Sequence, residues 1–543
     1  MSRGKKLFLM SFLTLIALIA VGQFHHNADP GGTKTGNATD YLAATGVKKV
    51  AVSQTGLNAL VNEVGHLRIS INFTWLLMTG FLVLFMQVGF AFLVTGLTRA
   101  KNAGHMMMMN LSSFVIALLA YYAVGFAFQF GGINLVGGTS NLGGTSPLTG
   151  LFGHGNAGVI GTHGFFLQSG GSYDVGVMAF FLFQVVFMET AGYIIIGAIA
   201  ERISFAGFIL AELAMGAFIY PIYGNWVWGG GWLSQLGHSM DLGHGAVDFA
   251  GSGVVHATGG WAALALAMLL GPRIGKYRSD GTPRAFPGHN LGYVVIGTLV
   301  LTFGWMGFNP GSTFGSTDLR IAVIAVNTLL AASAGAVMAM AWTNWKWGKP
   351  DISMTCNGML AGLVAITAPC AFVAPWASVV IGLIAGALVC WSVEWYDRKL
   401  KIDDPCGAIS VHGMCGAWGL IAVGLFADGT YPLAGWNGVA GPVKGIFYGG
   451  SGGGQLLAQL IDVVVGFIWA WGVTYLIFLA VRRYITFRVS PEVEIAGLDE
   501  GEFGQVCYPD FLIRAEAASG ITNELDAVGA GTGTGARTDG GGD

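Results

Sequence analysis

Eleven predominantly apolar stretches follow one another along the chain, and each is long enough, or nearly so, to cross the hydrocarbon core of a membrane. Charged residues make up only 10% of the 543 residues, whereas a soluble domain carries about 25%. So little charge cannot cover a water-exposed surface of this size. We therefore expect an all-α polytopic membrane protein with eleven transmembrane helices. Their approximate ranges are 72–97, 105–130, 176–199, 204–223, 251–270, 289–308, 319–343, 355–373, 376–394, 407–426 and 459–481.

Lysine and arginine are distributed unevenly between the two sets of loops. After the first helix, fourteen lie in one set and only Arg320 and Lys444 lie in the other. Because loops rich in Lys and Arg stay in the cytoplasm, we expect a multi-pass protein of the inner (plasma) membrane, with its N-terminus outside and its C-terminus inside. The fourteen are Arg99, Lys101, Arg202, Arg273, Lys276, Arg278, Arg284, Lys346, Lys349, Arg398, Lys399, Lys401, Arg482 and Arg483.

The two ends of the chain differ in composition from the apolar region, which spans residues 72–484. Residues 1–22 combine basic residues with an apolar run, a pattern typical of a cleaved signal peptide, and a retained extra helix is the alternative. Residues 23–71 are polar and mixed and are expected outside the membrane. Residues 511–543 are rich in glycine and are predicted to be a disordered C-terminal extension.

The stretch DFAGSGVVHATGG, from Asp248 to Gly260, places an acid and a histidine at the start of an apolar run. A helix rises about 1.5 Å per residue, so His256 would lie about 12 Å deeper in the membrane than Asp248. Ionisable groups at that depth are costly and indicate function. At the start of a helix, Asp248 is also expected to cap backbone N–H groups.

A weak internal repeat appears when the stretch DPCGAISVHGMCGAWGLI, beginning at Asp404, is aligned with the one that begins at Asp248. Five predicted helices separate the two copies, so the second copy would be upside down in the membrane. Inverted repeats of this kind place their functional site at the midplane, between the halves. At an offset of 156 residues, the identities are Asp248 with Asp404, Gly251 with Gly407, Val255 with Val411, His256 with His412, Gly260 with Gly416 and Leu264 with Leu420.

Two histidines at the midplane allow three interpretations: hydrogen-bonded core residues, a conducting or proton-handling pair, or a di-histidine metal site. A catalytic metal site normally has three protein ligands, and no suitably spaced cysteine or carboxylate lies nearby, so we favour the conducting pair. Five of the six cysteines fall in or at the edges of apolar segments, and none forms a C-x-x-C pair. We interpret them as packing residues and expect no disulfide, metal or cofactor.

Six motifs, in order along the chain, resemble those of the ammonium transporter family (Amt/Mep/Rh), and of its bacterial Amt type in particular. The resemblance covers roughly residues 73–510. It implies a homotrimer whose subunits each have a pore among eleven helices, arranged as inverted five-helix repeats. The motifs are MQVGFAFLVTG at 86–96, GAIAERISF at 197–205, DFAGSGVVH at 248–256, WMGFNPGS at 305–312, IDDPCGAISVHGMCGAWG at 402–419 and RVSPEVEIAGLDEGEFG at 488–504.

The resemblance also implies roles for four residues of the pore. His256 and His412 look like the twin histidines of the pore centre. Phe187 and Phe308 look like the two stacked phenylalanines that close the outer mouth. A bare ion entering an apolar pore would lose many kcal/mol of hydration, whereas neutral ammonia would not, and imidazole nitrogens can donate to ammonia, accept from it or relay its proton.

Four further residues resemble the site that recruits ammonium. Trp228 and Ser312 look like the external cation site, with Phe183 beside them, because an aromatic face attracts a cation and a hydroxyl accepts one of its N–H donors. Asp248 looks like the essential buried aspartate near that mouth. The implied function is a transporter or channel, not an enzyme, that recruits ammonium, deprotonates it and conducts ammonia. Whether the proton and its charge also cross stays open.

Three alternatives remain at this point: an ammonium sensor that signals through its tail, an Rh-like channel for ammonia or carbon dioxide, and a membrane-embedded metalloenzyme built on the two histidines. Residues 485–510 resemble the cytoplasmic tail that in the family contacts neighbouring subunits and binds PII-type regulatory proteins. Glu189, two residues beyond Phe187, departs from the small neutral residue of many family members. We predict that Glu189 is either paired at the outer mouth or alters cation recruitment.

Overall fold

The computed structural model describes residues 55–132, 151–152, 158–168, 173–450 and 453–509. The predicted signal peptide, the first part of the polar segment that follows it and the glycine-rich extension lie outside the described residues. Ten helices in the described ranges are long and apolar enough to cross a membrane, and an eleventh apolar helix of 16 residues stands where the eighth span was expected. The prediction of an all-α protein with eleven transmembrane helices is confirmed.

Several spans consist of two or three consecutive helical stretches, because α-helix gives way locally to π-helix. In chain order the spans are α3 (Thr55–Leu97); α4, η2 and α5 (Ala103–Ala120, Tyr121–Gly125, Phe126–Phe130); α7 (Val175–Ile199); α8, η4 and α9 (Phe205–Ala214, Met215–Ile219, Tyr220–Val227); η5 and α11 (Ser252–Ala257, Thr258–Leu270); α12 (Leu291–Gly311); α13 (Ile321–Trp347); α14 (Ile352–Thr367); α15 and η6 (Pro375–Trp395, Tyr396–Leu400); η7 and α16 (Ile409–Met414, Cys415–Phe426); and α17 (Gly454–Val481).

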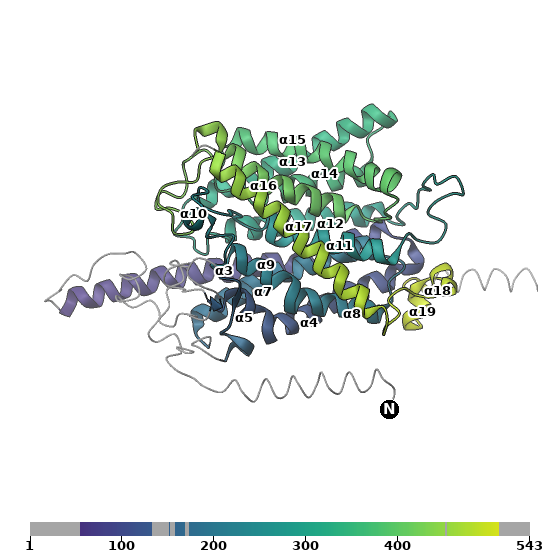
Figure 1. Cartoon of the computed structure of the whole chain (residues 1–543), viewed down its shortest axis with the longest axis horizontal. Coiled ribbons are helices and arrows are strands. Elements are labelled where there is room, and N and C mark those ends of the chain that lie inside the picture. Colours follow the sequence, from purple (N-terminus) through teal and green to yellow (C-terminus); the bar gives the residue numbers. More distant parts are fainter. Residues whose placement is uncertain (1–54, 133–150, 153–157, 169–172, 451–452, 510–543) are drawn as a thin grey trace, which may run out of the picture.

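Short elements lie at the two ends of the bundle. Helix α10 (Leu236–Ser239) lies at one end, and α18 (Pro491–Ala496) and α19 (Leu498–Phe503) lie at the opposite end (Figure 1). We call these the Trp228 end and the Arg273 end, after a residue that each contains. The remaining short elements are η1 (Ala100–Asn102), η3 (Phe165–Leu167), η8 (Ile446–Tyr448) and the antiparallel strands β1 (Leu151–Phe152) and β2 (Ile160–Gly161).

Several helix boundaries differ from the predicted spans, and two of the differences have a clear cause in the sequence. Helix α3 begins at Thr55, not near residue 72, because the polar stretch before the span carries apolar residues three and four positions apart, which is helical spacing. Helix α14 ends at Thr367, whereas the span was expected to reach residue 373. The residue before a proline is disfavoured in helix, so Pro369 and Pro375 confine residues 368–374 to turns before α15 begins.

Small residues allow the long helices to approach one another closely, as expected for helix packing in lipid. Helix α3 packs along α12, and α13 packs against both α14 and α15. A methyl group placed on Gly297 of α12 would lie 2.6 Å from the carbonyl oxygen of Gly89 in α3. Helix α17 runs diagonally across the bundle and contacts α11 and α16 (Figure 1).

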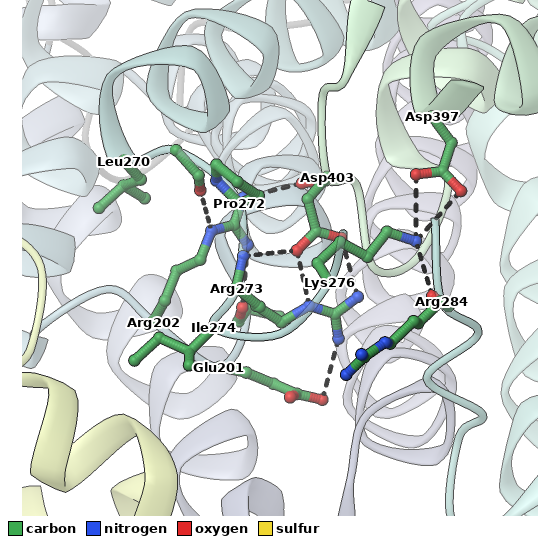
Figure 2. A network of polar contacts seen from close by, with 12 residues as sticks. Glu201, Arg202, Leu270, Pro272, Arg273, Ile274, Lys276, Arg284, Asp397 and Asp403 are labelled. Carbon is green, nitrogen blue, oxygen red and sulfur yellow. Dashed lines mark hydrogen bonds and ion pairs between the residues drawn. The ribbon is translucent and has the colours of Figure 1, made fainter. Parts of the chain in front are cut away.

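The Arg273 end is held together by a buried polar network (Figure 2). Arg273 donates from Nε and Nη2 to both carboxylate oxygens of Asp403, at 2.8 and 2.9 Å, and also pairs with Glu201 at 3.3 Å. Burial alone would raise the pKa of Asp403, but the hydrogen bonds and charge of Arg273 lower it below its usual value. Arg202 donates to the carbonyl oxygens of Ala200, Gly271 and Asp403. The network ties three loops to one another.

The C-terminal tail docks at the same end of the bundle through its acidic side chains. The Asp499 carboxylate accepts from the backbone N–H groups of Gly104 and His105 at the start of α4, at 2.9 and 2.7 Å. The Glu502 carboxylate accepts from the N–H of Phe205, at the start of α8, at 2.7 Å. Carboxylates at helix N-termini satisfy unpaired N–H groups and interact favourably with the helix dipole. The tail up to residue 509 is therefore part of the folded body.

Candidate functional site

Two interrupted helices, η5–α11 and η7–α16, begin in the same way. Before the first, Oδ1 of Asp248 accepts from the N–H groups of Gly251 and Ser252, and Oδ2 accepts from those of Gly253 and Val254, all at 2.8–2.9 Å. This is the capping role predicted for Asp248, extended to four donors. Before the second helix, Asp404 accepts from the N–H groups of Ala408 and Ile409, at 3.1 and 2.8 Å.

Each cap turns the chain through a glycine with positive φ. Gly251 has φ +112° and Gly407 has φ +75°, and these two positions correspond in the repeat. A side chain is strained in that backbone conformation. Each turn then leads into one π-helical segment, and each segment carries one histidine, His256 in η5 and His412 in η7. π-Helical turns are rare and often mark functional sites.

The two interrupted helices cross so closely that their histidines meet. A methyl group on Gly260 would lie 2.2 Å from the nitrogen of Gly413, which leaves room only for hydrogen at that crossing. Nδ1 of His412 lies 3.3 Å from Nδ1 of His256, and both rings are buried. One of these nitrogens must donate while the other accepts. Nε2 of His256 has no hydrogen-bond partner among the described residues.

A column of aromatic rings lies against the histidine pair. Phe187 and Phe308 stack with ring centroids 4.0 Å apart and planes 25° from parallel, as predicted for a stacked pair. His256 in turn stacks on Phe308 at 5.5 Å and on Trp305 at 5.0 Å. Sequence reasoning missed Trp305, although its position three residues before Phe308 on one helix places both on the same face. The indole N–H of Trp305 donates to Thr367 Oγ1 at 3.0 Å, which fixes the ring.

A cavity of about 530 Å³ lies at the Trp228 end of this column, and we call it the Trp228 cavity. Four of the predicted residues line it together: Phe183, Phe187, Trp228 and Ser312. The Ser312 hydroxyl donates to the Phe308 carbonyl at 2.9 Å, so its oxygen lone pairs remain as acceptors.

Asp248 does not line the Trp228 cavity, because both of its carboxylate oxygens face backbone N–H groups. Instead its carbonyl oxygen accepts from the Trp228 indole N–H at 2.7 Å. Asp248 therefore orients Trp228 and the turn before His256 without reaching the cavity.

Sequence reasoning also missed a group of cavity residues from loops. Tyr431, Trp436 and Asp318 line the Trp228 cavity, and the Tyr431 hydroxyl donates to Asp318 at 2.6 Å. The loop 427–450 is rich in glycine and has no helical period, so its aromatic residues gave no signal. Gln184 lines the cavity as well, and its place one residue after Phe183 could have suggested this.

A second cavity lies on the other side of the histidines, and we call it the His412 cavity. Its volume is about 20 Å³, which is enough for about one water molecule. His412 lines it together with Phe90, Tyr193, Asn357 and Cys406. Two cavities thus flank one buried pair of histidines, and the Phe187–Phe308 stack stands between the Trp228 cavity and the histidines.

Of the two roles predicted for Glu189, pairing at the outer mouth is wrong, and an effect on cation recruitment stays a prediction. Glu189 is buried within the bundle, where its carboxylate accepts from Gln87 of α3 at 3.3 Å, and it is absent from the Trp228 cavity. Successive residues of a helix are rotated by about 100°. Glu189 therefore points about 200° away from Phe187, toward α3.

The six cysteines are free thiols, and all but Cys507 are buried, as expected for packing residues. No three His, Cys, Asp or Glu side chains in the described ranges come together in a way that could hold a metal ion.

Comparison with known proteins identifies the family to which this architecture belongs. A sequence model of the Ammonium Transporter Family matches residues 74–508. The chain belongs to the ammonium transporter family.

Relatives and solved structures agree with this assignment. The ammonium transporter Amt2 of Archaeoglobus fulgidus is 50% identical over 444 residues, which cover 81% of this chain and 89% of the relative. The ammonium transporter Amt1 of Haloferax mediterranei is 36% identical, with 87% and 84% covered. A structure named "Sensor Amt Protein" has a TM-score of 0.68 at 36% identity and covers 80% of this chain and 99% of its own. Candida albicans Mep2 has a TM-score of 0.65 at 28% identity, with 78% and 87% covered. The site described above is thus the interior of an ammonium transporter fold.

Proposed function

We propose that this protein conducts ammonia derived from ammonium through the column of residues between its two cavities. The observation that carries the proposal is the histidine pair, buried among aromatic rings between the Trp228 cavity and the His412 cavity. An ammonium ion would lose many kcal/mol of hydration in this column, and nothing charged in the column would replace it. Neutral ammonia avoids that loss.

The Trp228 cavity is suited to recruiting ammonium. The faces of Trp228 and Phe183 attract a cation, each worth about 0.5–2 kcal/mol, and the Ser312 hydroxyl oxygen accepts an N–H. The Phe187–Phe308 stack then separates the hydrated cavity from the histidines. At this stack ammonium gives up its proton to water of the Trp228 cavity, and neutral ammonia continues to His256 and His412.

Asp248 assists this step at a distance. Its carboxylate binds four backbone N–H groups and so holds the turn that orients both Trp228 and His256. It also adds negative potential near the entrance. Asp248 acts in this proposal as a positioning residue, not as a group that contacts the ion.

The Trp228 end faces the outside of the inner (plasma) membrane in this proposal, and the Arg273 end faces the cytoplasm. The concentration of Lys and Arg at the Arg273 end supports this orientation. A homotrimer, with a pore in each subunit, and binding of a PII-type regulatory protein to the tail at 485–510 follow from the family resemblance. The tail docks on the starts of α4 and α8, and in this proposal these are the cytoplasmic ends of the spans.

Uptake by the purified protein in liposomes tests the proposal. We expect labelled methylammonium uptake by the wild type, and loss of it in Asp248→Ala and His256→Asp. Trp228→Leu should weaken apparent affinity about 2- to 30-fold, since about 0.5–2 kcal/mol of cation–π attraction is removed. The exposed Trp391 on α15 provides a matched control, because Trp391→Leu leaves the cavity intact.

Other outcomes would favour the alternatives. A protein that binds ammonium but moves little of it would be a sensor. Carbon dioxide permeation with no effect of Trp228→Leu would indicate an Rh-like gas channel. Normal transport by Asp248→Ala would contradict the mechanism proposed here.

A further inference from the structure

Helix α3 is much longer than a membrane requires. Its 43 residues span about 65 Å at 1.5 Å per residue, whereas the hydrocarbon core is about 30 Å thick. The part that precedes the predicted span, residues 55–71, extends away from the rest of the bundle (Figure 1). A single helix of this length is marginally stable in water unless it packs against something.

One face of this extension is apolar and open. Its large apolar residues are each between 47% and 59% exposed. They are Leu57, Leu60, Val64, Leu67 and Ile71. Five large apolar side chains in a row on one water-exposed helix form an uncovered patch of the kind that marks an interaction surface.

The spacing of these residues indicates that the partner is a helix. They alternate at intervals of three and four, which is the a and d pattern of a coiled coil. The same stripe continues into the membrane-spanning part of α3 with Met78, Phe81, Phe85 and Val88, which are also exposed. Only Thr74 interrupts it, so one seam of the helix is apolar over more than four heptads. A partner that fits this seam is another helix with a matching stripe.

The charged residues beside the apolar stripe indicate which helix the partner is. With Leu60 at position d and Val64 at position a, Glu63 occupies position g and Arg68 occupies position e of the next heptad. Residues at g and e of neighbouring parallel chains face one another across a coiled coil and set the choice of partner. Opposite charges at these two positions of one sequence complement a second copy of that sequence in parallel alignment.

We propose that residues 55–71 of neighbouring subunits form a short parallel coiled coil that extends outward from the membrane and joins the subunits of the oligomer. The inference rests on the homotrimer given under the proposed function, in which symmetry places identical helices in parallel. The seam at 78–88 continues the contact into the membrane, so the coiled coil extends an interface between subunits.

Disulfide cross-linking in liposomes tests the proposal. Cys507 is the exposed cysteine and is first replaced by serine, since the other five are buried. Leu60→Cys at position d should then form disulfide-linked subunits under mild oxidation. Asn62→Cys, on the opposite face at position f, is the matched control and should form few.

Charge reversal tests the register. Arg68→Glu should lower the cross-linking of Leu60→Cys about twofold to fivefold, because it places like charges across the seam. The double change Glu63→Arg with Arg68→Glu should restore it, which a general loss of folding would not do.

The mass of the wild-type protein in detergent distinguishes failure of the coiled-coil proposal alone from failure of the homotrimer as well. A trimer in which Leu60→Cys and Asn62→Cys cross-link equally, or neither does, would overturn the coiled coil and leave the homotrimer standing. It would also show that another segment covers the stripe. A wild-type monomer would overturn both the homotrimer and the coiled coil, although ammonium uptake could still be present.

Discussion

At the scale of single residues, the turn before each histidine depends on one glycine. Gly251 combines a φ of +112° with close contacts, since a methyl group there would lie 2.5 Å from Val255 and 3.2 Å from the Trp228 ring. Asp248 can bind four N–H groups only while the chain keeps this turn. The cap, Trp228 and His256 therefore share one backbone conformation.

Substitution of this glycine should damage both stability and transport. We expect Gly251→Ala to reduce the free energy of unfolding by about 1–3 kcal/mol from backbone strain, and to weaken methylammonium uptake because Trp228 is displaced. Gly472 of α17 is the matched control, because a methyl group there meets nothing within 4 Å. Gly472→Ala should be neutral or stabilising by about 0.5–1 kcal/mol. Thermal unfolding and uptake assays measure both effects, and equal behaviour of the two variants would refute the argument.

Glu189 lies in the wrong place to recruit a cation. Its carboxylate contacts Gln87 at 3.3 Å, and Oε1 has no hydrogen-bond partner among the described residues. We expect Glu189→Gln to leave the apparent affinity for methylammonium unchanged, in contrast to Trp228→Leu. The neutral amide removes the need to bury a carboxylate without a cation, so the midpoint of thermal unfolding should stay the same or rise. A weakened affinity would show that Glu189 acts on the cavity at a distance.

At the scale of helices, the sequence determined most of the architecture, and its omissions have physical causes. Long runs of apolar residues and the positions of the charged loops were sufficient to predict the eleven spans. An apolar run of that length leaves water when it forms a helix that crosses the bilayer. Hydropathy carries no information about hydrogen-bond register, so the π-helical turns of η5 and η7 were not predicted. The repeat does pair Gly251 with Gly407 and His256 with His412, and these are the positions at which the two turns prove to be alike.

The candidate site could be predicted where its residues lie in motifs that resemble those of the family, and was predicted less completely elsewhere. Phe187, Phe308, His256 and His412 meet as the resemblance implied. The cavity residues of the loop 427–450 were missed, because their approach depends on the folded loop. The error at Glu189 was avoidable, since two steps along a helix turn a side chain to the opposite face.

The ion pair between Arg273 and Asp403 should dominate the stability of the Arg273 end. Both side chains are almost completely buried, and removing one partner of such a pair costs about 3–5 kcal/mol. We expect Asp403→Asn to lower the free energy of unfolding by this amount. Asp397 pairs with Lys276 at a more exposed site, so Asp397→Asn should cost about 0–1 kcal/mol. Equal losses in thermal unfolding would contradict the role given to burial.

The pH dependence of this pair follows from the lowered pKa of Asp403. A carboxylate whose pKa is lower in the folded than in the unfolded protein stabilises the fold above its unfolded value, about 3.9. The contribution is lost as the pH falls through the lower, folded value. The difference in stability between wild type and Asp403→Asn should therefore be constant from neutral pH down to about 4 and shrink only below that.

At the scale of the whole molecule, the two ends of the bundle have opposite character. The Trp228 end carries the large cavity and its aromatic wall, whereas the Arg273 end carries the buried ion pairs and the docked tail. In the proposed function, this polarity gives transport a direction of entry when the Trp228 end faces outward. One residue of the tail, Cys507, reports on that orientation, because it is the exposed cysteine among six.

Labelling of Cys507 with a membrane-impermeant maleimide should reveal which end faces the cytoplasm. We expect labelling in inside-out vesicles and none in intact spheroplasts, with Cys507→Ser abolishing the signal in both. Burial raises the pKa of the Cys507 thiol above its usual value, and the thiolate is the reactive form. Labelling should therefore become faster as the pH rises from 7 toward that pKa. Labelling in spheroplasts alone would reverse the orientation, place the Trp228 cavity on the cytoplasmic side and turn the proposed uptake pathway into one for export.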